Sequence, residues 1–376
     1  MANPNFVLKK LDKQKKIIYT KKKEKRFSFG GIMQTRVSVK DIAKELNISL
    51  STVHKALTGK NGIGEARRKE VLETAHRLGY EVNSVAQSLA RKDIRLGIFM
   101  PNRWQEYFEA MKEGMEEEIR KLKKYKVEGL FYYLSKDLSD KEAEKALSWI
   151  REENIDVLIY CPSIYALNQA FLDALKNAKV PVFLAGSSFQ AIERIAEIHV
   201  DAPLSGKIAA DFLRHTAKSP LTAAVLAGYM SVRPHKEKAE AFCERIRSFG
   251  GTATVFETED DADKTYAMAK KAAEEGYNAI YVATATSESA CRYIEEEGLQ
   301  NEISLICTDV FDLLKGYMKR NVVKATIYQN QEKVGRSAVR AAYDYLVKTH
   351  SYGMEEETFA DTISIRPTLL MLADIE

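Results

Sequence analysis

One short segment carries outward side chains that could contact the edges of DNA bases. It runs from Leu50 to Leu57, and its outward positions are Leu50, Ser51, His54 and Lys55. Residues at this spacing share one side of a helix. Hydroxyl and imidazole groups can donate to or accept from base edges, an ammonium group can reach a guanine or a phosphate, and a leucine can contact a thymine methyl. The segment is therefore predicted to be a base-reading helix.

Two further helices must hold this segment in place. The first has an apolar face formed by Val39, Ile42, Ala43 and Leu46. Asn47-Ile48-Ser49 ends it, and Ser49 can cap the next helix by accepting from a free backbone N–H. The second helix turns Val53, Ala56 and Leu57 inward, and a third is expected over residues 65–78. This pattern is typical of a helix-turn-helix, although an ordinary helical hairpin has the same apolar spacing.

Other polar residues near these helices could contact phosphates, which fixes the register on DNA without reading its sequence. They are Thr52, Lys60, Asn61 and Arg67. The glycine-rich residues 59–64 look like a phosphate-binding loop, but they follow a helix rather than a strand. We therefore interpret them as a turn.

Four motifs follow one another at short intervals in this region. They are Val39-x-Asp41-Ile42-Ala43, Ile48-Ser49-x-x-Thr52-Val53, Gly79-Tyr80-x-x-Asn83 and Val85-Ala86-x-x-Leu89. Together they resemble the lactose-repressor (LacI/GalR) family of bacterial transcription regulators, and the resemblance covers roughly Val37 to the C-terminus. It implies a cytoplasmic, sequence-specific DNA-binding regulator, more often a repressor, controlled by a small carbohydrate-like ligand. Arginine is common in the family where this chain has Lys55, and lysine lacks the bidentate fork.

The same resemblance implies that residues 83–91 form a hinge helix, folded on the operator and paired with its twofold mate in the minor groove. Asn83 can cap such a helix, and its apolar face consists of Val85, Ala86 and Leu89. Leu89 can wedge between base steps and kink the duplex. A plain linker is the alternative, but a linker needs no apolar face. A hinge that pairs with a twin predicts a homodimer on a pseudo-palindromic operator.

Positive charge is concentrated at the N-terminal end. Residues 1–30 hold ten Lys or Arg against two acidic residues, and residues 36–95 hold twelve against seven. Because the whole chain carries +4, the rest is net negative, and the basic end should meet polyphosphate. Residues 1–36 are predicted to be a disordered basic extension. It is either an arm that adds non-specific DNA affinity or the product of an upstream start codon, with Met33 as initiator; the second is slightly favoured.

From Ile94 onward, short β-rich runs alternate with amphipathic helices, which indicates parallel sheets covered on both faces. Strands are expected over residues 95–100, 127–134, 156–161, 181–185, 223–227, 252–256, 279–283, 304–308 and 323–328. The resemblance implies an α/β fold of two doubly wound subdomains related to periplasmic sugar-binding proteins. The predicted domains are the helix-turn-helix headpiece over 37–82, the hinge over 83–93 and an effector-binding and dimerisation domain over 94–376. Within the latter, subdomain 1 comprises 94–198 and 328–352, and subdomain 2 comprises 199–327 and 353–376, with crossings near Ile198, Ile327 and Tyr352.

Ligand contacts are expected beyond the carboxyl ends of these strands. By resemblance they are Trp104, Gln105, Tyr107, Phe108, Ser187, His235, Lys238, Thr284, Asp309 and Gln329. Asp309 matches the family's ligand carboxylate and Gln329 a polar contact from the hinge, whereas the aromatic residues could equally be core. Lys238 replaces the usual arginine, and the segments around Ser187 and Thr284 depart from those of sugar binders. His235 with Lys238 could favour an acidic ligand or could simply begin a solvated helix.

Composition narrows the remaining function classes. Cys161, Cys243, Cys291 and Cys307 lie in apolar segments without metal-ligand spacing, which favours free thiols in a reducing cytoplasm. The sequence has no apolar run long enough to span a bilayer, no paired carboxylates and no nucleophile–base set. We therefore predict no enzyme, cofactor, metal or membrane partner. The runner-up function is a sugar-sensing module with vestigial DNA binding.

Overall fold

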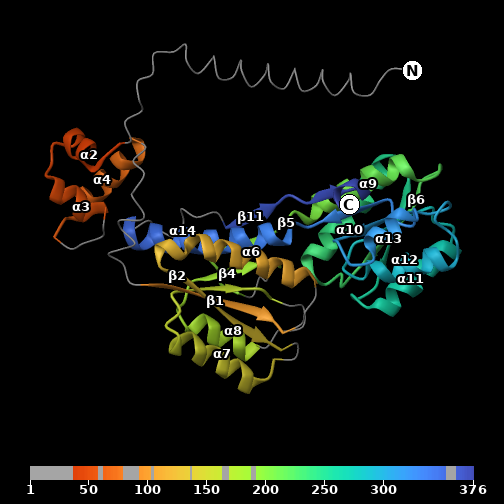
Figure 1. The fold of residues 1–376 in the computed structure, drawn as a ribbon, viewed down its shortest axis with the longest axis horizontal. Helices are drawn as coiled ribbons and strands as arrows, with labels where there is room; N and C mark the ends of the chain where they lie inside the picture. Colours follow the sequence, from red (N-terminus) through yellow and green to blue (C-terminus); the bar gives the residue numbers. More distant parts are fainter. Residues whose placement is uncertain are drawn as a thin grey trace, which may run out of the picture. The chain divides into compact units, whose positions relative to one another are not determined.

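The computed structural model describes residues 37–57, 62–78, 93–102, 106–135, 138–162, 169–187, 192–352 and 361–376. The chain divides between Asn83 and Ser84 into two compact units, a small helical one and a large α/β one (Figure 1). Within the described ranges, every helix is too short or too polar to cross a lipid bilayer. The basic extension and the hinge segment over 83–91 lie outside the described residues, so their predictions stay predictions.

The helical unit consists of α2 (Val39–Glu45), α3 (Leu50–Leu57) and α4 (Glu65–Arg77). The backbone N–H and hydroxyl of Ser38 both donate to the Asp41 carboxylate at 2.7 Å, which caps α2 and lowers the pKa of Asp41. Side chains of all three helices then meet in a small core in which Ile42, Val53 and Val71 are fully buried. The predicted helix-turn-helix arrangement is therefore present.

The first sheet of the α/β unit is parallel throughout. Its strands are β1 (Ile94–Pro101), β2 (Val127–Leu134), β3 (Val157–Tyr160), β4 (Val182–Ala185), β5 (Ala196–Val200) and β11 (Thr362–Ile365), in the order β11-β5-β4-β3-β1-β2. Helices α6 (Glu106–Leu122) and α14 (Gln331–Tyr352) cover one face, and α7 (Asp140–Glu152) and α8 (Gln169–Asn177) cover the other. The inner strands β3 and β4 are continuous apolar runs because both of their faces are buried.

The second sheet repeats this plan with one antiparallel edge. Its strands are β6 (Thr222–Ala227), β7 (Thr252–Glu257), β8 (Ala279–Val282), β9 (Ser304–Thr308), β10 (Ala325–Tyr328) and β12 (Thr368–Leu370), in the order β12-β10-β9-β8-β6-β7. Helices α9 (Ala202–Thr216) and α10 (Arg233–Ser248) cover one face. The other face is covered by α11 (Ala262–Glu274), α12 (Ser287–Glu296) and α13 (Leu314–Lys319). Only β12 runs against its neighbour among the described strands.

The predicted fold class, a helical headpiece with two doubly wound α/β subdomains, is confirmed. Two of the segments that join the sheets lie after β5 and after β10, next to the positions expected near Ile198 and Ile327. The predicted position of the third crossing, near Tyr352, is wrong. Tyr352 ends α14, and the chain then returns to the first sheet as β11 before it crosses at Arg366-Pro367 to β12. β11 lacks the continuous buried apolar run of the central strands, and β12 spans only three residues.

Helices α6 and α14 approach each other at backbone distance. A Cβ atom added to Gly114 would lie 2.0 Å from the Glu332 carbonyl oxygen, and one added to Gly335 would lie 2.0 Å from the Met111 carbonyl oxygen. Each helix therefore carries a glycine where the other helix leaves no space for a side chain. This contact fixes α14, which begins beside the second crossing, against the first sheet.

We expect Gly335→Ala to lower the free energy of unfolding by about 1–3 kcal/mol, because the methyl group forces the two helices apart. Gly316→Ala is the matched control: this glycine is also helical, but its added Cβ would meet only the mobile end of Arg320, at 3.1 Å. Its expected effect is neutral or stabilising by up to about 1 kcal/mol, from helix propensity. Urea denaturation of both variants measures the difference, and equal stabilities would contradict the close-contact interpretation.

Candidate DNA interface and ligand cleft

The second headpiece helix presents its predicted outward residues to solvent. Ser49 caps α3 as expected, because its hydroxyl accepts from the Thr52 backbone N–H at 3.0 Å. Leu50 is 48% exposed, Ser51 and His54 are exposed, and Lys55 is half-buried. Asn47, at a φ of +50°, closes the turn between α2 and α3 in a conformation that asparagine tolerates well.

The predicted phosphate contacts are described only in part. Thr52 is half-buried and its hydroxyl lies 2.8 Å from that of Ser49, and Arg67 is exposed at the start of α4, where it pairs with Glu70 at 2.7 Å. Lys60, Asn61, Asn83, Val85, Ala86 and Leu89 lie outside the described residues, and the predictions for them remain untested. The described part of the headpiece thus offers one short helix face as its candidate base reader.

Three of the predicted ligand residues meet at the carboxyl ends of the strands of the second sheet. Asp309 follows β9, is 8% exposed and has a φ of +64°. Its carboxylate accepts from the Gln329 backbone N–H at 3.2 Å and from Gln329 Nε2 at 2.7 Å. Lys238 Nζ in turn donates to Gln329 Oε1 at 3.3 Å. Burial raises the pKa of Asp309, and the charge of Lys238 opposes that rise.

Lys238 is a buried cation rather than part of a solvated helix start. It is 4% exposed and also donates to the Ala283 carbonyl oxygen at 3.0 Å, next to Thr284. Burial lowers its pKa, while the charges of Asp309 and Asp260 counteract that effect. Thr284 is buried beside this contact, and its hydroxyl lies 2.8 Å from that of Thr286. The ends of three strands thus converge on one ammonium group.

His235 faces Asp260, a residue that the sequence analysis did not select. His235 Nδ1 lies 3.8 Å from Asp260 Oδ2. Burial and the charge of Lys238 lower the pKa of His235 to about 4, and burial raises the pKa of Asp260 to about 6. At pH 7 the ring is therefore neutral and the carboxylate is charged. Gly228 permits this arrangement, because a Cβ there would lie 2.3 Å from Asp260 Oδ1 and 2.5 Å from His235 Nδ1.

The first subdomain contributes Tyr107 to this region. The Tyr107 hydroxyl donates to the Gly186 carbonyl oxygen at 3.4 Å, and burial and the charge of Asp309 both raise its pKa. Phe108 packs edge-on against Tyr107 and, with it, against the core of the first sheet. Ser187 is half-buried beside Gly186. Trp104 and Gln105 lie outside the described residues, so the ligand role predicted for them stays a prediction.

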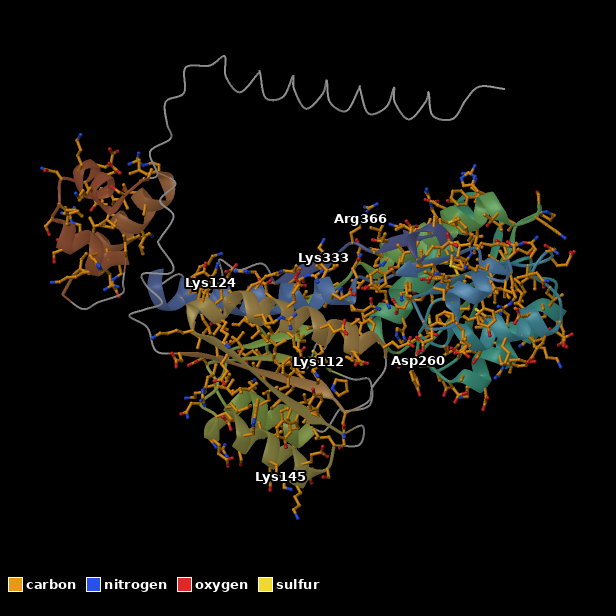
Figure 2. All side chains as sticks on the ribbon, in the orientation of Figure 1. Lys112, Lys124, Lys145, Asp260, Lys333 and Arg366 are labelled. Atoms are coloured by element: carbon orange, nitrogen blue, oxygen red, sulfur yellow. The ribbon has the colours of Figure 1, made fainter. Side chains whose placement is uncertain are left out.

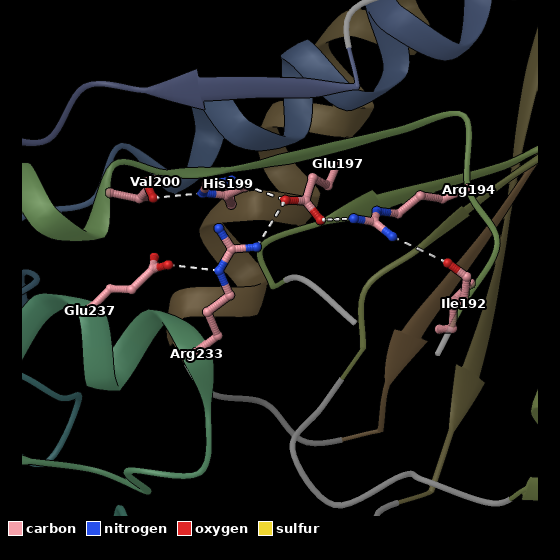
Figure 3. Close-up of polar contacts among 7 residues, drawn as sticks. All are labelled: Ile192, Arg194, Glu197, His199, Val200, Arg233 and Glu237. Atoms are coloured by element: carbon pink, nitrogen blue, oxygen red, sulfur yellow. Dashed lines mark hydrogen bonds and ion pairs between the residues drawn. The ribbon is translucent and has the colours of Figure 1, made fainter. Parts of the chain in front are cut away.

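A second polar network joins the two subdomains, and the sequence analysis missed it (Figure 3). The Glu197 side chain on β5 is 3% exposed and pairs with Arg194 at 2.9 Å and with His199 at 3.5 Å. Arg233, at the start of α10, approaches the same carboxylate at 4.0 Å and holds Glu237 at 2.7 Å. Glu197 lies in β5, a strand that was not among those predicted, so its burial could not be expected from the sequence. Its partner from α10 lies too far along the chain for local patterns to indicate.

The family match falls in the larger, α/β unit of the chain. Residues 96–350 match the family described as periplasmic binding protein domain. The chain belongs to this family. Catabolite control protein A of Streptococcus mutans is 25% identical over 252 residues, which cover 66% of this chain and 72% of that protein.

Two solved structures share the fold of this chain. A glucose-galactose binding protein of Geobacillus stearothermophilus has a TM-score of 0.62 at 14% identity and covers 76% of this chain and 99% of its own. The Lac repressor bound to ONPG has a TM-score of 0.58 at 17% identity and covers 89% of this chain and 98% of its own. The predicted resemblance to lactose-repressor regulators is confirmed.

We expect Asp260→Asn to stabilise the fold above neutral pH. The folded pKa of Asp260, about 6, lies above its ordinary value of 3.8, so the stability that its protonated form contributes is lost as pH rises through 6. Asparagine avoids that loss and should add about 1–3 kcal/mol at pH 8 and nothing below pH 4. Thermal and urea unfolding at both pH values measure this, with the exposed neighbour Asp263→Asn as control. A gain that does not depend on pH would contradict it.

Proposed function

We propose that this chain is a transcription regulator that reads DNA with α3 and responds to a small ligand bound among the strand ends of its α/β unit. The observation that carries the proposal is the presence of two separate sites in one chain. Exposed Leu50, Ser51 and His54 lie on a capped helix-turn-helix, and the buried Lys238–Gln329–Asp309 cluster lies at the strand ends of a periplasmic-binding-protein fold. One site recognises DNA and the other recognises the ligand.

The finer parts of the proposal concern the assembly and the ligand. We infer a homodimer on a pseudo-palindromic operator, because one headpiece offers few base-edge contacts and two-fold operators mirror two-fold proteins. A carbohydrate-like ligand is supported by the glucose-galactose binding protein and the ONPG-bound repressor that share the fold. The relatives are regulators rather than enzymes. Repression is the expected mode, as in the Lac repressor.

The competing function is a sugar-sensing module that no longer binds DNA. Gel shifts against genomic fragments at increasing salt distinguish the two, because binding driven by phosphate contacts weakens steeply as salt rises. Salt-sensitive, sequence-selective shifts support the regulator, and the absence of any shift at low salt supports the sensing module. Light scattering of the DNA complex tests the homodimer in the same samples.

His54→Ala should reduce affinity for a selected operator by about 1–3 kcal/mol and leave binding to random DNA nearly unchanged, because the imidazole is expected to contact a base edge. Arg67→Ala is the matched phosphate variant. It should weaken both kinds of DNA alike and reduce the salt slope by about one. Fluorescence anisotropy at several salt concentrations measures both effects. Equal losses for His54→Ala on operator and random DNA would remove α3 as the base reader.

Asp309→Asn should weaken ligand affinity at least tenfold, because charge-assisted hydrogen bonds to ligand hydroxyls contribute about 1.5–3 kcal/mol each. DNA binding without ligand should stay as in the wild type. Calorimetry with the ligand found by a thermal-shift screen gives the affinity, and Asp263→Asn serves as an exposed control. If the variant still responds at wild-type ligand concentrations, Asp309 has only a structural role.

A further inference from the structure

The charges at the strand ends of the second sheet indicate what kind of ligand they accept. Lys238 is opposed by two carboxylates, Asp309 and Asp260, and all three are largely buried. In Figure 2, Asp260 lies on the side of the second subdomain that faces the first. Glu106, at the start of α6, adds another negative charge from the first subdomain, and its pKa is raised by burial and by the nearby charges of Asp312 and Asp309. Among these four described groups, negative charge therefore exceeds positive charge.

The Lys238 ammonium group already interacts with other groups of the protein. Lys238 donates to the Ala283 carbonyl oxygen and to Gln329 Oε1, and it neutralises part of the charge of Asp309 and Asp260. A phosphate or carboxylate ligand would have to displace these contacts and approach two buried carboxylates. Burying an anion without a free cationic partner is costly. The described site thus disfavours the acidic ligand that His235 and Lys238 suggested in the sequence.

Two hydrogen-bond acceptors in this region lack a donor. Gln331 is 2% exposed and its Oε1 has no hydrogen-bond partner. Its side chain bonds to the Asp309 carboxylate, so the amide nitrogen faces Asp309 and Oε1 remains open. His235 Nδ1 is also without a partner in the described structure. Because the ring bonds to the Tyr229 backbone through its other nitrogen, Nδ1 is left as an acceptor.

These unmatched acceptors define two places for donors. His235 Nδ1 and Asp260 Oδ2 face each other at 3.8 Å. An ammonium group has three donors and a positive charge, so it can serve both atoms. At the other place, Asp309 and Gln331 Oε1 can accept from hydroxyl groups. Buried acceptors left unsatisfied cost about 1–3 kcal/mol each, and a donor-rich ligand would remove that cost.

We propose that the cleft ligand is a polyhydroxylated amine, an amino sugar or amino polyol, whose ammonium group binds between Asp260 and His235 and whose hydroxyls donate to Asp309 and Gln331. This inference rests on the proposed function and names the ligand class of the same site. It excludes sugar phosphates and sugar acids as the primary ligands of this site.

The test uses the full-length protein and sets of sugars that differ in one group. Glucosamine, glucose, N-acetylglucosamine and glucose 6-phosphate form one set, the galactose equivalents form a second, and glucamine with sorbitol forms a third. Calorimetry at pH 7 should give at least one amine that binds about tenfold or more tightly than its neutral parent, with the matched phosphate weaker than both. A phosphate that binds more tightly than its matched amine overturns the proposal, and so does a panel in which no amine binds.

Asp260→Asn separates recognition of the amine from a structural effect. The variant should lose about tenfold or more in affinity for the amine and change less than about threefold for the neutral parent. Asp263→Asn should change neither affinity. Equal losses for amine and parent would contradict an ammonium contact at Asp260.

Operator binding by fluorescence anisotropy, measured with each sugar, distinguishes this proposal from the proposed function. If a phosphorylated sugar alters DNA affinity while the amines do not, the regulator stands and the ligand class is wrong. If an amine binds with the predicted selectivity but the chain binds no DNA, the ligand class stands and the regulator is wrong.

Discussion

The buried ammonium group of Lys238 imposes the strongest constraint on the second subdomain. An ion removed from water must find charged and hydrogen-bonding partners or lose its charge. Its partners here come after β8, β9 and β10, as the Ala283 carbonyl, Asp309 and Gln329. These groups lie far apart in the sequence and meet because parallel strands bring their carboxyl ends to one edge of the sheet. The polar cluster and the doubly wound topology therefore require each other.

Electrostatic contacts between the two subdomains bear on how the proposed ligand could act on the protein. Near these strand ends, the first subdomain contributes Tyr107 and Glu106, and the charge of Asp309 helps to raise the pKa of both. Glu197 and Arg233 attract each other across the subdomains, whereas Glu106 and Asp309 repel. A ligand can shift a conformational equilibrium only by its differential affinity for the two states. A positively charged group near Asp309 would weaken the repulsion and leave the attraction in place.

Features that depend on residues close together in the sequence could be predicted, whereas contacts between distant segments could not. Helical spacing over a few residues predicted α3 and its outward side chains, and the Ser49 cap follows from local backbone chemistry. Asp309 and Gln329 were selected through the family resemblance, and each directly follows a buried strand of the sheet. Asp260 lies beyond the end of β7, a partly exposed edge strand, and no motif singled it out.

Features that depend on strand order were not predictable in this way. Glu197 and Arg233 come from different subdomains, β11 lacks a continuous buried apolar run, and β12 spans only three residues. The misplaced third crossing has the same origin, because nothing local marks the return of the chain to the first sheet. The sign of the charge around Lys238 could not be predicted without the fold. His235 and Lys238 alone suggested an anion site, but the structure places Asp260 and Asp309 beside them.

Two polar side chains of the strand-end cluster lie at a segment that joins the subdomains. Gln329 and Gln331 flank the second crossing, between β10 and α14, and one of them carries an unpaired buried oxygen. Helix α14 is fixed to α6 by backbone contact at Gly335, so a movement at its first turn is passed to the first subdomain as a rigid displacement. A ligand that bonds to Asp309 and Gln331 would therefore act directly at a crossing between the subdomains, next to the helix that the glycine contact holds against α6.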